Sequence, residues 1–138
     1  MTKGTEIVAD FVSALRNRPG IKTVEPCGSI SRNVFEVNGS ACWLLYLKGR
    51  GEEPYRWGVT DNVIKRLKQQ SQNWFVVLLY ESQNTGYLLP FKDVINYIQK
   101  NIWPLGNDGD YKPAAPGNYL SQNTPFKTSD EFFRLLRA

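Results

Sequence analysis

The chain has 138 residues, of which 41% are hydrophobic and 13% aromatic, and its formal net charge is +4. This length and composition predict one globular domain over residues 1–138 that needs no disulfide or metal to fold. The absence of histidine excludes Ser-His-Asp and Cys-His catalysis and histidine-based nucleases, so an enzyme would rely on carboxylates, lysine, tyrosine or metal-bound water.

The sequence also predicts the cellular compartment. Cys27 and Cys42 form no CxxC pair and are typical of small buried thiols in a reducing environment. No run approaches the roughly 18 apolar residues that a membrane span requires, and residues 1–10 lack a secretory apolar region. We therefore expect a cytoplasmic protein with no membrane partner.

The first predicted elements are a helix and a hairpin. Residues 2–20 place apolar side chains at helical spacing and stop at a Pro-Gly pair, which predicts an amphipathic helix. A short β-rich piece at residues 21–27 precedes two strands, 31–37 and 40–50. Asn38 and Gly39 join these strands, and this pair predicts a type I′ turn with positive φ at both positions.

The second half alternates strands and helices. Thr60 is the expected cap of a helix at residues 61–70, and the continuous apolar run 74–81 predicts a central strand covered on both faces. A strand at 85–90, a helix at 91–102 and a long surface excursion at 103–125 follow. Thr128 and Glu131 have capping-box spacing before a last helix. The fold class expected is α+β or α/β, with a mixed sheet of four to five strands flanked by helices.

One lysine stands out because it ends an apolar strand. The order of elements around Lys48, with its strands "VFEV" and "LLYLKGR" and its helix "GVTDNVIKRL", resembles the core of PD-(D/E)xK nucleases over residues 33–80. This resemblance implies a restriction-endonuclease-like core and a Mg²⁺-dependent deoxyribonuclease. In it, Lys48 steadies the attacking water or the phosphate charge, Glu36 is a catalytic metal ligand, and Glu6 is an auxiliary metal ligand.

The sequence departs from that family at one position. The second metal-holding acid should stand two residues before the lysine, where this chain has Tyr46. Strand alternation puts Tyr46 on the same face as Lys48, and a phenol is a poor Mg²⁺ ligand. Either another carboxylate, Glu25 or Glu52, has moved into the site, or the fold is retained and cleavage is lost.

A second resemblance covers the same stretch and explains the tyrosine. GIY-YIG nucleases use two strand tyrosines and a helix arginine, and "LLY", "YRWG" and "NVIKRL" would supply Tyr46, Tyr55 and Arg66. In this alternative Tyr46 is itself catalytic. The later metal-binding acid of that family has only Asp93 as its counterpart on the helix at 91–102.

Basic and aromatic residues near Lys48 suggest a polyanionic partner. A nucleic-acid surface, with DNA as a possible partner and the choice between DNA and RNA left open, would use its cations and one tryptophan. A solvated helix face is the alternative. The residues concerned are Arg50, Arg56, Trp57, Lys65, Arg66 and Lys68. Trp43, Trp74 and Trp103 are expected in the core, and Asp108 with Asp110 favours a turn over a calcium loop.

Two functional hypotheses follow from these patterns. The first is a nucleic-acid-associated protein, and the second is a structural or protein-interaction module whose ancestral cleft is filled; a homodimer is considered for either. The surroundings of Lys48 discriminate between them. An open cleft with two or more carboxylates favours an enzyme, whereas a lysine covered by Trp57 or by residues 103–125 favours the module.

Overall fold

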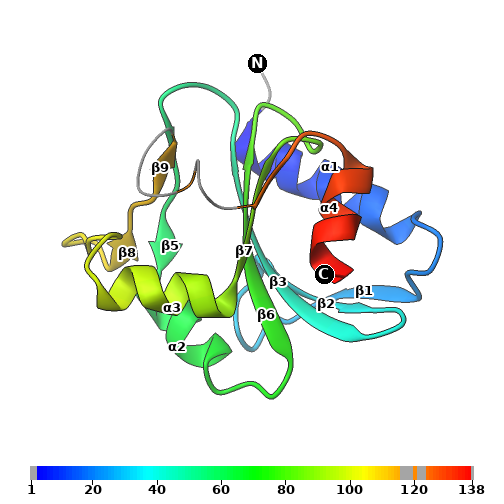
Figure 1. The fold of residues 1–138 in the computed structure, drawn as a ribbon, viewed down its shortest axis with the longest axis horizontal. Helices are drawn as coiled ribbons and strands as arrows, with labels where there is room; N and C mark the ends of the chain where they lie inside the picture. Colours follow the sequence, from blue (N-terminus) through cyan, green and yellow to red (C-terminus); the bar gives the residue numbers. More distant parts are fainter. Residues whose placement is uncertain (1–2, 116–119, 121–123, 138) are drawn as a thin grey trace.

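The fold is a mixed sheet covered by helices on both faces (Figure 1). A computed structural model describes residues 3–115, 120 and 124–137. The sheet has the order β1-β2-β3-β6-β7-β10, and only the β3–β6 pair is parallel. Its strands are β1 Thr23–Pro26, β2 Val34–Asn38, β3 Cys42–Arg50, β6 Asn73–Tyr80, β7 Gly86–Pro90 and β10 Thr124–Phe126. The α+β class with a mixed sheet is therefore confirmed.

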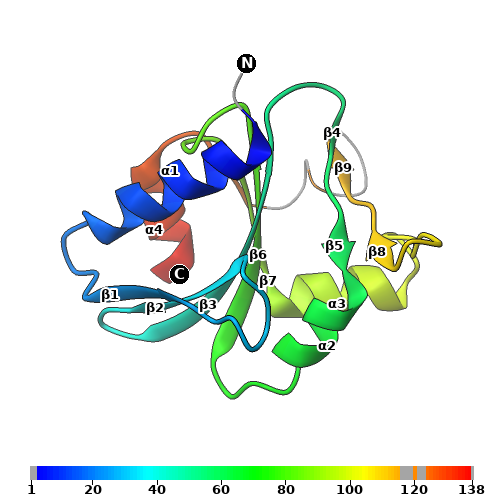
Figure 2. The ribbon, with the colours of Figure 1, turned by 180° about the vertical axis from the view of Figure 1, so that it is seen from behind.

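The helices divide into two pairs, one on each side of the sheet (Figures 1 and 2). Helices α1 (Gly4–Arg16) and α4 (Ser129–Arg137) cover one face, and α2 (Asp61–Leu67) and α3 (Phe91–Gln99) cover the other. Because strand side chains alternate, Leu45 packs on the α1/α4 side while Leu44 and Tyr46 pack on the α2/α3 side. Each face of the sheet therefore has its own buried cluster.

The central strand is where the apolar run predicted it. Strand β6 lies between β3 and β7, and its residues from Trp74 to Leu79 are all buried. The parallel pairing of β3 with β6 is possible because α2 makes the crossover between them. This pairing brings the C-terminal ends of both strands, Arg50 and Tyr80, to the same edge of the sheet.

The hairpin between β2 and β3 forms, but the predicted type I′ turn is wrong. Asn38 pairs with Cys42, so residues 39–41 connect the strands, and neither Asn38 nor Gly39 has positive φ. Glycine serves another purpose here. A Cβ on Gly39 would lie 2.6 Å from the carbonyl oxygen of Gly20, so the close approach of two backbones requires it.

The excursion after α3 carries short strands that its sequence did not indicate. In two ribbons, β4 (Tyr55–Arg56) pairs with β9 (Ala114–Ala115), and β5 (Val59–Thr60) pairs with β8 (Asp110–Tyr111). Strand β10 then adds a sixth strand to the main sheet, which exceeds the predicted four to five. Strands of two or three residues are too short to show a hydrophobic period. The rest of the excursion, residues 116–119 and 121–123, lies outside the described residues.

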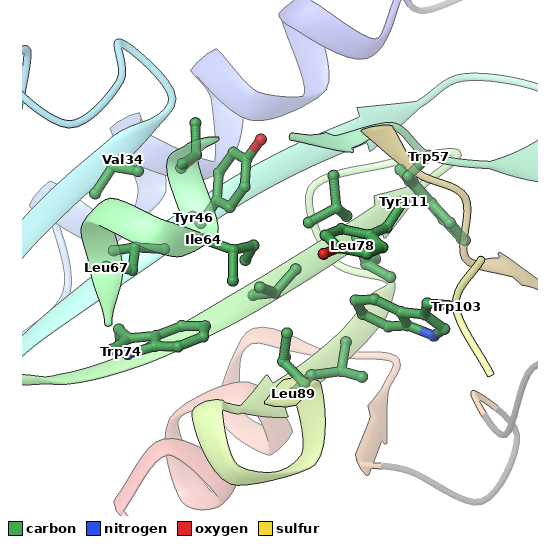
Figure 3. Packing of buried hydrophobic residues seen from close by; sticks show 14 of the residues in the cluster. Val34, Tyr46, Trp57, Ile64, Leu67, Trp74, Leu78, Leu89, Trp103 and Tyr111 are labelled. Carbon is green, nitrogen blue, oxygen red and sulfur yellow. The ribbon is translucent and has the colours of Figure 1, made fainter. Parts of the chain in front are cut away.

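The three tryptophans expected in the core are buried there, and Figure 3 shows Trp74 and Trp103 in the cluster between the sheet and α2 and α3. Trp43 lies in the cluster on the other face. Cys27 and Cys42 are free thiols of intermediate exposure. Within the part of the chain that the structure describes, no helix has the length and apolar character that crossing a membrane requires.

Candidate functional site

Lys48 is partly buried near the end of β3, and its neighbouring charges come from the excursion. Burial is the main cause that lowers the pKa of Lys48; Lys112 lowers it further and Asp110 opposes the shift. The ion pairs within 4 Å among the described residues do not include Lys48. The acidic neighbour of Lys48 is therefore Asp110, which belongs to residues 103–125. The two carboxylates from the sheet that a nuclease site would require are not its neighbours.

Tyr46 is a core residue with a structural hydrogen bond. Its side chain is 1% exposed, and its hydroxyl accepts a hydrogen bond of 3.1 Å from the backbone N–H of Thr60. Thr60 stands at the N-cap position of α2 as predicted, but its own side chain makes no capping bond. Tyr46 thus ties the start of α2 to the sheet. A catalytic role for it stays a prediction.

Glu36 lies on the α2/α3 side of β2, away from the position opposite Tyr46. In the β2–β3 register Glu36 faces Leu44, whereas Val34 faces Tyr46. The Glu36 carboxylate accepts hydrogen bonds from Asn38 Nδ2 at 3.2 Å and Gln72 Nε2 at 3.1 Å. These bonds engage its carboxylate with neighbouring amides.

The other carboxylates considered for a metal do not join Glu36 and Lys48. Glu6 is exposed on α1, which covers the opposite face of the sheet, and Glu52 is exposed in the turn after β3. Glu25 alone lies directly across from Glu36, on β1. Among the described residues, no three Cys, Asp or Glu side chains gather as a metal site. The arrangement therefore does not fit a Mg²⁺ centre at Lys48.

Most of the basic residues predicted to contact nucleic acid are exposed, but several are engaged locally. Lys65 pairs with Asp61 at 3.0 Å, and Arg66 donates to the Ile30 carbonyl at 3.0 Å. Arg56 and Lys68 are exposed as well, and Arg50 is half-buried.

Trp57 is 3% exposed, and its indole N–H donates to the Leu79 carbonyl at 2.9 Å. The tryptophan therefore lies inside the core, whereas most of these cations are exposed.

The residues of the GIY-YIG alternative lie on three different elements, β3, β4 and α2. Tyr46 is in the core, Arg66 bonds the Ile30 carbonyl, and Tyr55 lies on the β4–β9 ribbon. Asp93 is in the first turn of α3. The acidic loop forms a turn, in which the Asp110 N–H donates to Asp108 Oδ1 and Gly109 has a φ of +84°.

The structure also contains a groove that the sequence reasoning missed. It has a volume of about 610 Å³ and lies where the C-terminal ends of β3 and β6 meet the β4–β9 ribbon. We call it the tyrosine groove, and its lining residues are Glu53, Pro54, Tyr55, Tyr80, Tyr87 and Ala115. They come from four elements or their flanking turns, so only the folded chain assembles them.

Its three tyrosine rings form a continuous row. The centroids of Tyr55 and Tyr80 are 4.9 Å apart with a tilt of 40°, and those of Tyr80 and Tyr87 are 5.8 Å apart with a tilt of 36°. The buried Trp57 makes an edge-to-face contact with Tyr87, with ring centroids 6.3 Å apart and an interplanar angle of 80°. All three tyrosines are half-buried, so the row is supported by the core and still reachable from solvent.

A carboxylate orders one end of this row. The Tyr55 hydroxyl donates a hydrogen bond to Glu81 Oε1, and that bond is the main cause that raises the pKa of Tyr55 to about 12. Burial raises the pKa of Tyr87 as well. The hydroxyls of Tyr80 and Tyr87 have no hydrogen-bond partner among the residues that the structure describes.

One sequence signal could have indicated the groove. Tyr80 is the last residue of an apolar run that alternation puts on the Lys48 face, and Tyr87 pairs with Leu78 on the adjacent strand, so both face the same side. Tyr55 joins them only through the ribbon, which has no sequence signature. A comparison with models of known protein families and with curated proteins found no match for this chain.

Proposed function

We propose that the protein is a non-enzymatic interaction module that binds a segment of a partner in the tyrosine groove. The observation that carries this proposal is the supported, solvent-reachable row of Tyr55, Tyr80 and Tyr87 in a groove of about 610 Å³. Tyrosine is favoured in binding sites because it offers a large rigid contact area and a polar tip. Concave, mainly aromatic sites of this size are typical ligand sites.

The surroundings of Lys48 support a binding module over a nuclease. Metal-dependent hydrolysis would require carboxylates beside the lysine, and Glu36 and Glu6 lie on opposite faces of the sheet. The charged neighbours of Lys48 are Asp110 and Lys112, both from the excursion. Cleavage of DNA and binding of Mg²⁺ stay predictions, and they are tested below beside the groove.

The proposal is tested by selecting binders from a random peptide library displayed on phage. We expect the wild type to enrich a common sequence pattern and Tyr80→Ala to lose it, since Tyr80 is the middle ring of the row. A matched control is Tyr97→Phe, which keeps a buried ring on α3 outside the groove. Enrichment that is unchanged in folded Tyr80→Ala would contradict the proposal.

A parallel assay addresses cleavage. Supercoiled DNA is incubated with the wild type and with Lys48→Met in Mg²⁺ or Mn²⁺, and nicking is followed over time. We expect no nicking that depends on Lys48. Nicking by the wild type that Lys48→Met abolishes would establish the nuclease and overturn the non-enzymatic assignment.

A further inference from the structure

The spacing of the tyrosine row limits what can lie along it. The centroid separations of 4.9 and 5.8 Å mean that the outer rings are no farther apart than their sum, which slightly exceeds one turn of a polyproline II helix, about 9 Å. Because one turn lies within this upper limit, the span of the row is compatible with two ligand residues one such turn apart on the outer rings.

The hydroxyls in the groove suit an extended backbone. Those of Tyr80 and Tyr87 have no hydrogen-bond partner among the described residues, so each O–H group can donate to a carbonyl oxygen of a ligand. A polyproline II segment has no internal hydrogen bonds, and all its carbonyls seek external donors. In an α-helical ligand the backbone carbonyls already accept hydrogen bonds within the helix, so they would not need the tyrosine hydroxyls.

The charge at the groove is acidic. Glu53 lines it, Glu81 bonds to its tyrosine at one end, and the exposed Glu52 precedes Glu53. The adjacent Arg50 uses its Nε for the carbonyls of Glu52 and Pro54, at 3.2 and 3.1 Å. Arg56 follows Tyr55 on the same short strand, so alternation directs it away from the groove.

We infer that the tyrosine groove binds a proline-rich peptide segment in polyproline II conformation, with a basic side chain directed to Glu53 and Glu81. This inference rests on the proposed binding function and names its partner. Proline rings pack on aromatic side chains, and the preformed conformation of the segment lowers the entropy lost on binding. The carboxylates hold the basic group, and this fixes the direction of the peptide.

Nucleic acid is the other ligand that a row of aromatic rings accepts, because unstacked bases lie flat on such rings. The carboxylates of Glu53 and Glu81 repel the phosphates that would accompany these bases. The exposed cations Lys65 and Lys68 belong to α2 or its end and do not line the groove. The charge distribution therefore favours a basic peptide.

The inference is tested with a short synthetic peptide that carries two prolines at i and i+3 and an arginine beside the second. Backbone amide shifts of ¹⁵N-labelled protein are followed by NMR during titration. We expect saturable shifts at Tyr55, Tyr80 and Tyr87, and a tenfold or greater loss of affinity in Tyr80→Ala. Replacing both prolines by alanine, or arginine by glutamate, should weaken binding by a similar factor.

A charge variant tests the orientation without removing a ring. Glu53→Gln with Glu81→Gln should weaken the arginine peptide about threefold or more and leave its Arg→Ala analogue unchanged. Glu6→Gln is the matched control, because Glu6 is exposed on the opposite side of the sheet. It should change neither affinity. If Tyr80→Ala fails to fold, this charge comparison still decides the result.

The outcomes separate the two proposals. Peptides selected for the groove that need neither proline nor a basic residue would overturn this inference and leave the binding module standing. Shifts at the groove with single-stranded oligothymidylate that exceed those with the peptide would also overturn it. No groove-dependent binder from the library and no shift with the synthetic peptide would contradict both.

Discussion

The two sides of the sheet are closed by different chemistry. On the α1/α4 side the buried cluster consists of aliphatic residues and phenylalanine, with Trp43 as its one residue bearing a polar side-chain atom among those described. On the α2/α3 side the cluster also contains three tyrosines, Tyr46, Tyr97 and Tyr111, and three tryptophans. The buried side chains of the α1/α4 cluster are held mainly by packing, whereas buried side chains of the α2/α3 cluster, such as Tyr46 and Trp57, also make hydrogen bonds.

Helix length explains much of this difference. Helix α1 has 13 residues and lies against β3, where the glycine pair Gly4 and Gly49 allows the two backbones to touch. Helix α2 has only 7 residues, so the two ribbons and large aromatic side chains fill the remaining area. Aromatic residues that bridge a wide gap bring polar atoms with them. This comparison indicates why the tyrosine groove lies on the α2/α3 side.

The largest effect is expected for Trp103→Ala. Trp103 is 0% exposed and packs on Tyr97 at 5.9 Å, so its removal leaves a large cavity between α3 and the ribbons. We expect a loss of about 3–5 kcal/mol in the free energy of unfolding, measured by urea denaturation. Leu105→Ala in the same segment is the control, because Leu105 is 52% exposed and should change stability by less than about 0.5 kcal/mol. Equal effects would mean that the excursion does not close the core.

A smaller effect is expected when one hydrogen bond of the aromatic side is removed. Tyr46→Phe keeps the ring but leaves the Thr60 N–H without its acceptor. We expect a loss of about 2 kcal/mol in thermal or urea unfolding, with faster amide exchange at the start of α2. Phe75→Leu, on the opposite face of β6, should not change exchange in α2. Unchanged exchange in Tyr46→Phe would show that the bond does not hold the helix.

The aromatic side should also make stability depend on alkaline pH. Burial and then the hydrogen bond to Asp61 raise the pKa of Tyr111 from 10.0 to about 12. Because the folded state favours the protonated phenol, this contribution is complete below pH 10 and is lost as pH rises to about 12. Between pH 10 and pH 12 the free energy of unfolding should fall in both proteins. The fall should be smaller in Tyr111→Phe than in the wild type, by on the order of 1 kcal/mol. If the free energy of unfolding falls equally with pH in the two proteins, the raised pKa of Tyr111 does not contribute to stability.

The smallest effect is expected for a surface ion pair on the α1/α4 side. Arg18 and Asp130 lie 2.7 Å apart, but the Asp130 side chain is 86% exposed. Asp130→Asn should therefore cost less than about 0.5 kcal/mol, with no further loss in high salt. Arg18→Ala should cost more, because the guanidinium also stacks on Phe133 at 4.3 Å. The reverse order would mean that the ion pair is more important than packing.

The candidate site was less accessible to sequence reasoning than the fold. Lys48 and Tyr46 do share a face of β3, as alternation predicted, but the register sets Glu36 two residues away from the position facing Tyr46. A register depends on the turn and on side-chain packing across strands, and the Asn-Gly pair suggested a different turn from the one that forms.

What the sequence by itself determined are the elements with a strong hydrophobic period: α1, the β2–β3 hairpin, the central strand β6, and the strand and helix that follow it. Their hydrophobic period is formed by residues close together in the chain, so it can be recognised without the fold. The tertiary structure alone decided the two ribbons, strand β10 and the meeting of Tyr55, Tyr80 and Tyr87. Pairs of two-residue strands have too few side chains to form a hydrophobic pattern. They exist because packing brings distant parts of the chain together, and the backbone groups of these parts then form hydrogen bonds with each other.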